Sequence, residues 1–301
     1  RISESVKGNV SIDGKVYGVP LDMMANAVFY NKDYFEKYQI EVPTTYDEFI
    51  EACETLKANG ITPLTAGYQD LISIGATFFT MFYGAPYMQN PNYATEMMEG
   101  GKSASEYASL KTTLEQWRTL NSYENADNKT ITTDRAEQLF ASGETGMILI
   151  GTWGLGAIRE YNPDGNIGGF MYPSENTAGD SYLPIATDDT FMIAKNSPNQ
   201  AAAIAFFEYM TRLDAAAAWA GTVGQLSSIA DVTVDGMDPA AQDIADIVAT
   251  GQVARWTEIA TFTGQYSSSF YNVLQEYALT TKMTPDEFCD QLDKEFAAAK
   301  K

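Results

Sequence analysis

The chain has 301 residues, of which 45% are hydrophobic and 20% charged, as expected for a globular protein of one large or two ordinary domains. Its 40 acidic residues against 19 basic ones give a formal net charge of −21, which argues against a nucleic-acid partner. The sequence contains no histidine, which excludes histidine-based catalytic triads and His-ligated zinc sites. We therefore expect no transition metal. Cys53 and Cys289 are far apart in the sequence and are expected to be buried free thiols.

The first predicted elements are strands over residues 16–20 and 27–31, which are short runs rich in β-branched and aromatic residues. A helix follows them. Thr45 and Glu48 form a capping box at its start, and Gly60 marks its end.

A glycine-rich corner is predicted near the middle of the chain. A helix over residues 134–142 stops at Gly143, and residues 147–150 follow as a short buried strand, expected in a mostly parallel sheet. A helical pattern resumes at Leu155, so Trp153 lies between strand and helix among small residues. Gly151, Gly154 and Gly156 do not have the spacing of a dinucleotide fingerprint. No nucleotide and no other cofactor is therefore expected.

The last predicted elements are a strand over residues 190–194 and two helices. Residues 197–200 start one helix, with Pro198 at its first position and Phe206, Phe207 and Met210 on its buried face. Residues 284–287 start the other, whose buried face carries Phe288, Leu292 and Phe296. Single strands alternating with helices predict an α/β fold.

Trp153 has two interpretations at this stage. It is either an ordinary core tryptophan or a stacking platform at a cleft, because ligands of open α/β sheets bind beyond the carboxyl ends of the strands. A sugar presents apolar C–H faces that an aromatic ring can cover and a rim of hydroxyls that carboxylates or amides can bind.

Several segments resemble one protein family in the same order along the chain. LFASGETGMILIGTWGLGAI around Trp153 is similar to the cleft segment of the bacterial extracellular solute-binding proteins of sugar importers (family 1, maltose-binding-protein-like). DGKVYGVP with FYNKDYFEKYQIEVPTTYDEF, DDTFMIAKNSPNQAAAIAFFEYM, and KMTPDEFCDQLDKEF resemble the other hallmarks of that family.

The resemblance implies a two-lobed periplasmic-binding-protein-like fold of class II, with a ligand cleft between the lobes. Only twelve residues precede DGKVYGVP, so the N-terminal lobe is expected to lack its first section and to expose unpaired apolar surface. Residues 1–22 and 190–252 would form the rest of that lobe, and residues 23–189 and 253–301 the C-terminal lobe.

The function implied by the resemblance is reversible binding of a carbohydrate, expected to be an oligosaccharide, for an ATP-driven importer. The expected partners are the sugar and the membrane permease. The expected location is extracellular, on the cell surface or in the periplasm, with contact to the membrane only through a lipid anchor outside this chain. No enzymatic activity is expected.

The resemblance also assigns ligand contacts. Trp153 would stack on a sugar ring, whereas Met24 stands where the family has an acidic sugar ligand. Asp22 and Asn26 beside it are either substitutes for that ligand or hinge surface. Asp188 and Asp189 either grip vicinal hydroxyls or are solvated loop residues, and Phe270 is either a second stacking aromatic or part of the core. The remaining expected contacts are Gln69, Asp70, Gln225 and Trp256.

Two rival functions remain open from the sequence. A glycoside hydrolase would need two carboxylates at a set separation in space, which spacing along the chain cannot reveal. Another small solute, such as a polyamine, would suit the acidic composition. A phosphate ester would need a cluster of arginines, but the arginines are scattered along the sequence.

Overall fold

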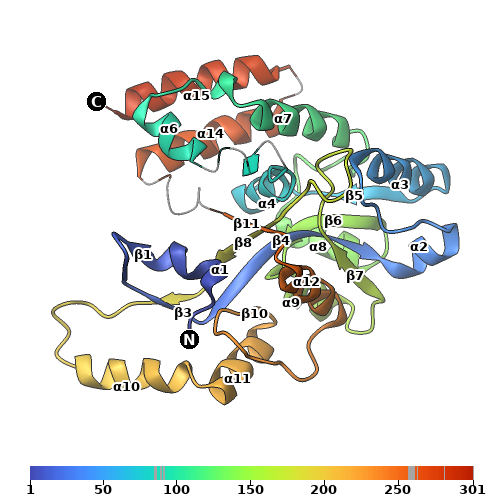
Figure 1. Cartoon of the computed structure of the whole chain (residues 1–301). Coiled ribbons are helices and arrows are strands. Elements are labelled where there is room, and N and C mark those ends of the chain that lie inside the picture. Colours follow the sequence, from blue (N-terminus) through green and yellow to red (C-terminus); the bar gives the residue numbers. More distant parts are fainter. Residues whose placement is uncertain are drawn as a thin grey trace.

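The computed structural model describes residues 1–84, 87–88, 90, 92–256, 262, 264–280 and 282–300 (Figure 1). In this part of the chain the strands are β1 (Ser11–Ile12), β2 (Lys15–Val16), β3 (Val19–Pro20), β4 (Asp22–Asn31), β5 (Thr62–Thr65), β6 (Thr145–Gly151), β7 (Ile167–Phe170), β8 (Leu183–Thr187), β9 (Thr190–Phe191), β10 (Leu226–Ser227) and β11 (Val253–Arg255). The helices are α1 (Glu4–Lys7), α2 (Lys32–Tyr38), α3 (Tyr46–Ala58), α4 (Leu71–Met81), α6 (Tyr93–Glu99), α7 (Ala108–Leu120), α8 (Thr133–Ala141), α9 (Gly154–Tyr161), α10 (Gln200–Met210), α11 (Leu213–Val223), α12 (Pro239–Thr250), α14 (Gln265–Leu279) and α15 (Pro285–Ala299), with 3-10 turns η1 (Gly8–Val10) and η2 (Ala104–Glu106). This interleaving of strands and helices confirms the α/β class.

The main sheet is organised around β4. Among the described residues it has seven strands in the order β11-β8-β4-β6-β5, with β10 and β7 also paired to β4. Every described ladder to β4 is antiparallel, and in this part of the chain only β5–β6 and β8–β11 pair in parallel. The prediction of a mostly parallel sheet is therefore wrong. Alternation of strands and helices along the chain does not reveal that the longest, central strand runs against its neighbours.

The two faces of β4 pack against different layers. Met24, Val28 and Tyr30 join the core cluster that also contains residues of α3, α4, α7, α14 and α15. Ala25, Ala27 and Phe29 join the other cluster, with residues of α8, α9 and α12. This alternation follows the two-residue period of a strand. Helices therefore cover both faces of the sheet, and Figure 1 shows α14 and α15 on one side and α9 and α12 on the other.

Most helix ends lie where the sequence predicts them. Thr45 and Thr284 each accept a hydrogen bond from the backbone N–H of the glutamate three residues on, in complete capping boxes. Gly60 and Gly143 follow α3 and α8 with φ of 79° and 78°, a backbone conformation that favours glycine after a helix. The buried strand predicted at residues 147–150 is confirmed within β6, which is buried along its whole length.

Helix α10 differs from the prediction. It begins at Gln200 after the N-cap Asn199, so Pro198 precedes the helix instead of occupying its first position. Only Met210 of the three residues predicted on its buried face is buried, and Phe206 is 49% exposed. Phe207 is partly buried and packs on Phe191 of β9 with the ring centroids 6.1 Å apart, so the face of α10 is only partly covered.

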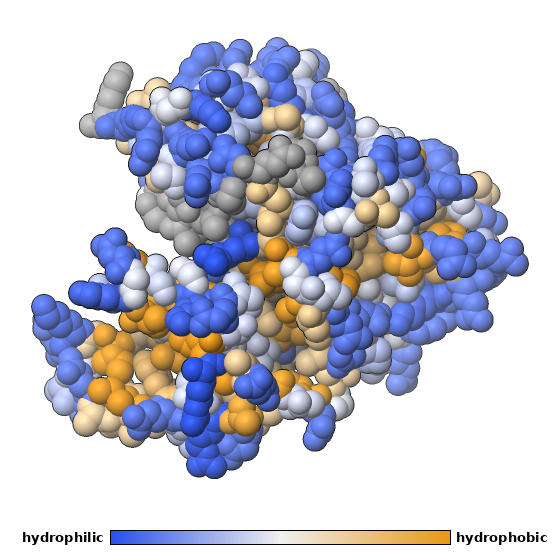
Figure 2. Space-filling model, viewed as in Figure 1, coloured by the Kyte–Doolittle hydropathy of each residue, from blue (hydrophilic) through white to orange (hydrophobic). Residues whose placement is uncertain are grey.

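Exposed apolar residues gather in the same part of the molecule. Met192, Ile204, Phe206, Tyr209 and Leu213 are all more than 40% exposed. Figure 2 shows apolar side chains at the surface in the region that α10 and α11 occupy in Figure 1. These residues lie on α10, at the start of α11 and directly after β9. The expected exposure of unpaired sheet surface in the N-terminal lobe stays a prediction.

Helix α12 lies on the large sheet, although its residues fall in the range expected for the other lobe. Ile244 packs in the cluster beneath β4 and β7, and Lys32 forms an ion pair with Asp243 at 3.1 Å. Arg159 of α9 pairs with Asp238, the N-cap of α12. The division of the chain into lobes stays a prediction.

Both cysteines are buried and unbonded to each other, which confirms the expected free thiols. Burial raises the pKa of Cys53, and it raises the pKa of Cys289 to about 12. Both thiols are therefore protonated near neutral pH. Within the described residues, no helix combines the length and apolarity that crossing a membrane requires.

Candidate functional site

A hollow of about 350 Å³ opens at the point where β6 ends and α9 begins. Three aromatic side chains line it: Trp153 from this corner, Trp256 directly after β11, and Tyr271 of α14. Its other lining residues are Met24, Asn26, Leu71, Ile72, Gly75 and Ala76. None of these nine residues carries a charge.

Gly151, two residues before Trp153, explains how the indole reaches the hollow. Asn26 and Gly151 are directly opposite in the β4–β6 ladder. A Cβ on Gly151 would overlap the Trp153 indole and would lie 2.9 Å from the Asn26 Oδ1. Only glycine therefore lets the indole lie across the end of the strand beside the Asn26 amide. The glycine-rich corner thus makes room for an aromatic ring and not for a phosphate group.

Asn26 is a polar exception on an apolar strand face. It shares the face of β4 with Met24 and Val28 and is 1% exposed. Both its Nδ2 and its Oδ1 are buried without a hydrogen-bond partner among the described residues. Buried polar groups are nearly always hydrogen-bonded in proteins, so this amide requires an explanation.

The aromatic walls come from two further elements. The Trp256 ring packs on Phe79 of α4 with the centroids 4.6 Å apart, and its Nε1 is a third buried atom without a partner in the described part of the chain. Tyr271 packs on Gly75, where a Cβ would come within 3.2 Å of the tyrosine Cε1. Gly75 thereby allows α4 and α14 to approach at the wall of the hollow.

A buried carboxyl group lies behind the same corner. Glu137 of α8 is 5% exposed, and its Oε1 lies 3.1 Å from the position that a Cβ on Gly154 would take. Burial, with smaller contributions from Asp134 and Asp70, raises the pKa of Glu137 to about 7. Nothing in the sequence distinguishes Glu137, because a glutamate within a helix is usually a solvated side chain.

Four of the expected ligand residues meet elsewhere, at the start of β4. The buried Asp22 carboxylate accepts hydrogen bonds from Trp219 Nε1 of α11 at 2.5 Å and from the Asp189 backbone N–H at 2.6 Å. Gln225 donates through Nε2 to Asp188 Oδ2 at 2.9 Å and accepts from the Thr152 hydroxyl at 2.7 Å. None of these four residues lines the hollow.

Two carboxyl groups of this cluster, those of Asp22 and Asp188, have raised pKa values. Burial raises the pKa of Asp22, although the bond from Trp219 opposes the shift. Partial burial and then the neighbouring charges of Asp22 and Asp189 raise the pKa of Asp188 to about 6. The cluster joins β4, the β8–β9 link and β10, so its geometry indicates a role in holding chain crossings together.

Asp70 and Gln69 do not line the hollow either. Asp70 is the N-cap of α4, and its carboxylate accepts bonds from the backbone N–H of Ile72, Ser73 and Thr133 at 2.8–3.3 Å and from the Thr133 hydroxyl at 2.5 Å. Its oxygens are thus used to fix α4 against α8. Gln69 is exposed one residue earlier, whereas the next residues, Leu71 and Ile72, do reach the hollow.

Of the two interpretations of Phe270, its position favours the core residue over the stacking aromatic. Its ring is fully buried and packs on Phe262 and Phe79 with centroids 5.1 and 5.9 Å away, as a core residue does. The next residue, Tyr271, takes the position on the hollow that was expected of Phe270. Of the ten expected contacts, the structure brings Trp153, Asn26 and Trp256 together at one site.

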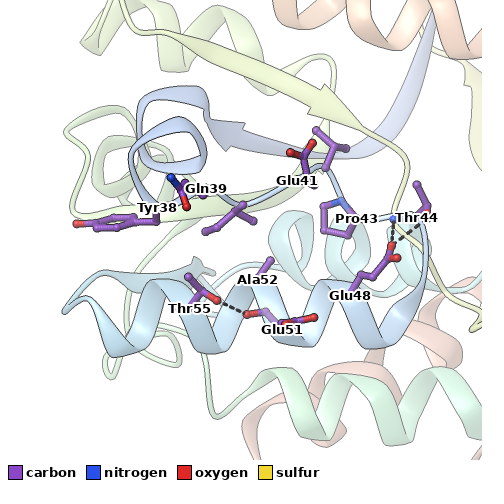
Figure 3. Close-up of a pocket in the computed structure, with 11 residues that line it drawn as sticks. Tyr38, Gln39, Glu41, Pro43, Thr44, Glu48, Glu51, Ala52 and Thr55 are labelled. Atoms are coloured by element: carbon purple, nitrogen blue, oxygen red, sulfur yellow. Dashed lines mark hydrogen bonds between the residues drawn. The ribbon is translucent and has the colours of Figure 1, made fainter.

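A second, larger depression of about 440 Å³ lies along α3 (Figure 3). Its Glu48 carboxylate is already used by the backbone N–H and hydroxyl of Thr44 at 2.8 and 2.9 Å, and the Thr55 hydroxyl donates to the Glu51 carbonyl. No side-chain atom of its described lining is buried without a partner. The hollow beside Trp153 is therefore the better candidate site.

The described residues contain no group of three or more Cys, Asp or Glu side chains that could hold a metal ion. That a transition metal is unnecessary stays a prediction, which elemental analysis of the purified protein would test.

The fold is that of two-lobed solute-binding proteins. The chain superposes over its whole length on RafE in complex with raffinose, with a TM-score of 0.81 and 24% identity over 78% of that chain. The apo form of RafE from Streptococcus pneumoniae gives a TM-score of 0.80 with 23% identity. A family model described as bacterial extracellular solute-binding protein matches residues 2–217. The chain belongs to this family.

Curated relatives with sugar-related names are among the similar sequences. The multiple sugar-binding protein of Streptococcus mutans is 26% identical over 286 residues, which cover 89% of this chain and 64% of the relative. The melibiose/raffinose/stachyose-binding protein MelE of Bacillus subtilis is 25% identical over 74% of this chain and 53% of its own length. The present chain thus spans between half and two thirds of these relatives.

Proposed function

We propose that this chain reversibly binds a carbohydrate, of oligosaccharide size, as the solute-binding part of an ATP-driven importer. The observation that carries the proposal is the uncharged hollow in which Trp153, Trp256 and Tyr271 surround the buried amide of Asn26. Aromatic rings stack on the C–H face of a sugar ring, and a side-chain amide forms hydrogen bonds with the hydroxyls at its rim. The sugar-binding relatives named above support the same class of ligand.

The lining of the hollow argues against the rival ligands. A polyamine would need carboxylates and a phosphate ester would need arginines, but no charged side chain belongs to the lining that the structure describes. A glycoside hydrolase would place two carboxyl groups about 5–10 Å apart at the sugar. Asp22 and Asp188 instead bond to Trp219, to a backbone N–H and to Gln225. We therefore propose binding without catalysis.

The wider role follows from the family. The two lobes would close on the sugar by a hinge motion, and the closed form would dock on the membrane permease. Binding would be of about micromolar strength, or about −8 kcal/mol, so that the sugar can be released. An extracellular or periplasmic location, with a lipid anchor outside this chain, completes the proposal.

A titration tests the proposed function. Isothermal calorimetry of the chain with neutral oligosaccharides, including raffinose and stachyose, should yield saturable heat for at least one of them. Trp153→Ala should abolish or strongly weaken that signal, whereas the control Tyr17→Ala, at a site 56% exposed and outside the hollow, should not. Heat from spermidine but from no sugar would replace the carbohydrate by a polyamine.

A further inference from the structure

The polar content of the hollow is small and specific. Asn26 offers one acceptor, Oδ1, and one donor, Nδ2, side by side, and Trp256 offers a second donor, Nε1. All three atoms are buried without a partner among the described residues, while the surrounding lining is apolar or aromatic. Leaving such groups unpaired is unfavourable, so a ligand that pairs with them gains affinity.

We propose that Asn26 determines specificity by binding two neighbouring hydroxyls of a neutral sugar ring, with Trp256 Nε1 donating to a further oxygen of the same ring. This inference rests on the proposed function. A side-chain amide suits a vicinal hydroxyl pair because Oδ1 accepts from one hydroxyl while Nδ2 donates to the other. The Trp153 indole lies beside the amide, so stacking and hydroxyl binding act on the same ring.

The same lining excludes charged sugars. A uronic acid would bring a carboxylate into a hollow whose described lining residues include no Lys or Arg, in a protein of net charge −21. A glucosamine unit would bring an ammonium group to a hollow with no Asp or Glu among the nine lining residues that the structure describes. Burying either charge unpaired is strongly unfavourable. The site therefore selects neutral sugar units.

The role of Asn26 has an unusual consequence for stability. A residue kept for packing loses stability when it is replaced. Asn26→Leu, in contrast, removes two unpaired polar atoms from an apolar strand face while keeping a similar volume. The unliganded variant should therefore melt at the same temperature as the original chain or higher, even though it binds sugar more weakly.

The first experiment needs no variant. Calorimetric titrations of the chain compare neutral trisaccharides (raffinose, maltotriose, cellotriose and xylotriose) with trigalacturonic acid and the glucosamine trimer. The neutral ligand that binds best should exceed both charged trimers by at least about tenfold in affinity. Equal binding of a charged trimer would overturn the inference while leaving the carbohydrate function intact. Absence of binding by any sugar would overturn the proposed function, and the inference with it.

The second experiment uses variants and the same best neutral trisaccharide. Asn26→Leu should weaken its binding about 10–100-fold, and Trp256→Phe, which keeps a ring but removes Nε1, about tenfold. The matched control is Thr145→Val, because the Thr145 hydroxyl is also buried and unpartnered but lies at the far end of β6 from Gly151. That control should bind as the original chain does. Unchanged affinity of Asn26→Leu, or a lower melting temperature of Asn26→Leu and Asn26→Ala without ligand, would show that Asn26 is a structural residue.

Discussion

Asn26 and Gly151 face each other across the β4–β6 ladder, and the absent side chain of Gly151 is what brings the Trp153 indole beside the Asn26 amide. The need for glycine at this position of β6 is therefore set by the binding site beside the strand. A residue larger than glycine would compete for the space that the indole occupies.

Gly151→Ala should therefore damage both the site and the fold. The added methyl must displace the indole or the Asn26 amide, and overpacking of this kind costs about 1–3 kcal/mol of unfolding free energy. Sugar affinity should fall with it. Denaturant unfolding and calorimetry measure the two effects. The matched control is Gly156→Ala in α9, where a Cβ meets nothing within 4 Å. That helical position should gain about 0.5–1 kcal/mol. Equal behaviour of the two variants would contradict the steric argument.

Trp153→Ala tests whether this indole is a platform or a core residue. It is partly buried and contacts both core clusters. As a platform, its loss should weaken sugar binding by about 2–4 kcal/mol, as for a central aromatic anchor. Stability without ligand should fall by only about 1 kcal/mol. A core tryptophan would instead cost about 3–5 kcal/mol of stability. Titration with the best-binding sugar and unfolding without sugar separate the two roles.

Phe270→Ala should produce the opposite pattern from Trp153→Ala. Its ring is fully buried among Phe78, Phe79 and Phe262, so truncation should lower the free energy of unfolding by about 3–5 kcal/mol. Sugar affinity of the folded fraction should change little, because the ring does not line the hollow. Selective loss of affinity with unchanged melting temperature would restore Phe270 to the ligand site.

The contrast between Phe270 and Tyr271 shows where sequence reasoning stops. Capping boxes at Thr45 and Thr284 and the glycines after α3 and α8 are local signals, so their positions could be predicted closely. A family resemblance locates a loop or helix turn but not which of two adjacent residues faces the site. Neighbouring residues on a helix point about 100° apart.

The direction of β4 and the exposure of α10 could not be predicted from local sequence signals for a related reason. Both depend on which elements pack together in space, and an apolar helix face does not reveal what covers it. Asn26, by contrast, has a detectable signal. It is a polar residue inside the apolar run MMANAVF, at a position that the strand period assigns to a buried face.

Glu137→Gln should change how stability depends on pH. The pKa of Glu137 is raised from an ordinary 4.5 to about 7 in the folded chain, so unfolding between these values releases a proton. Its contribution to stability is therefore fully present below about pH 4.5 and is lost as the pH rises through about 7. The neutral glutamine removes this loss, and the variant should exceed the original chain by about 1–3 kcal/mol at pH 8. Urea unfolding at pH 5 and pH 8 measures the difference.

Glu48→Gln is the control of opposite sign. Hydrogen bonds from the Thr44 backbone and hydroxyl lower the pKa of Glu48, so its contribution is present at high pH and lost on acidification. That variant should lose stability at pH 8 relative to the original chain. A Glu137→Gln variant that is also less stable at pH 8 would mean that the Glu137 carboxylate is held charged by a favourable interaction.

Asp22→Ala distinguishes the ligand role of this residue from its role at the chain crossing. The buried carboxylate binds Trp219 Nε1 and the Asp189 backbone N–H and does not line the hollow. Its removal leaves the partly buried Trp219 Nε1 and the Asp189 backbone N–H without their charged acceptor, which should cost about 1–3 kcal/mol of unfolding free energy. The loss of the Trp219 bond should also alter tryptophan fluorescence. Affinity for the best-binding sugar, in contrast, should stay within about threefold, or roughly 0.7 kcal/mol.

The matched control for Asp22→Ala is Asp189→Ala, because Asp189 contributes its backbone N–H to the crossing and its carboxylate is exposed. That variant should keep the bond to Asp22, the tryptophan fluorescence and most of the stability. If Asp22→Ala instead lost sugar binding by tenfold or more, or about 1.4 kcal/mol, with its melting temperature unchanged, Asp22 would be a ligand contact. The sugar would then have to extend from the Trp153 hollow to the start of β4, where Asp188 and Gln225 also lie.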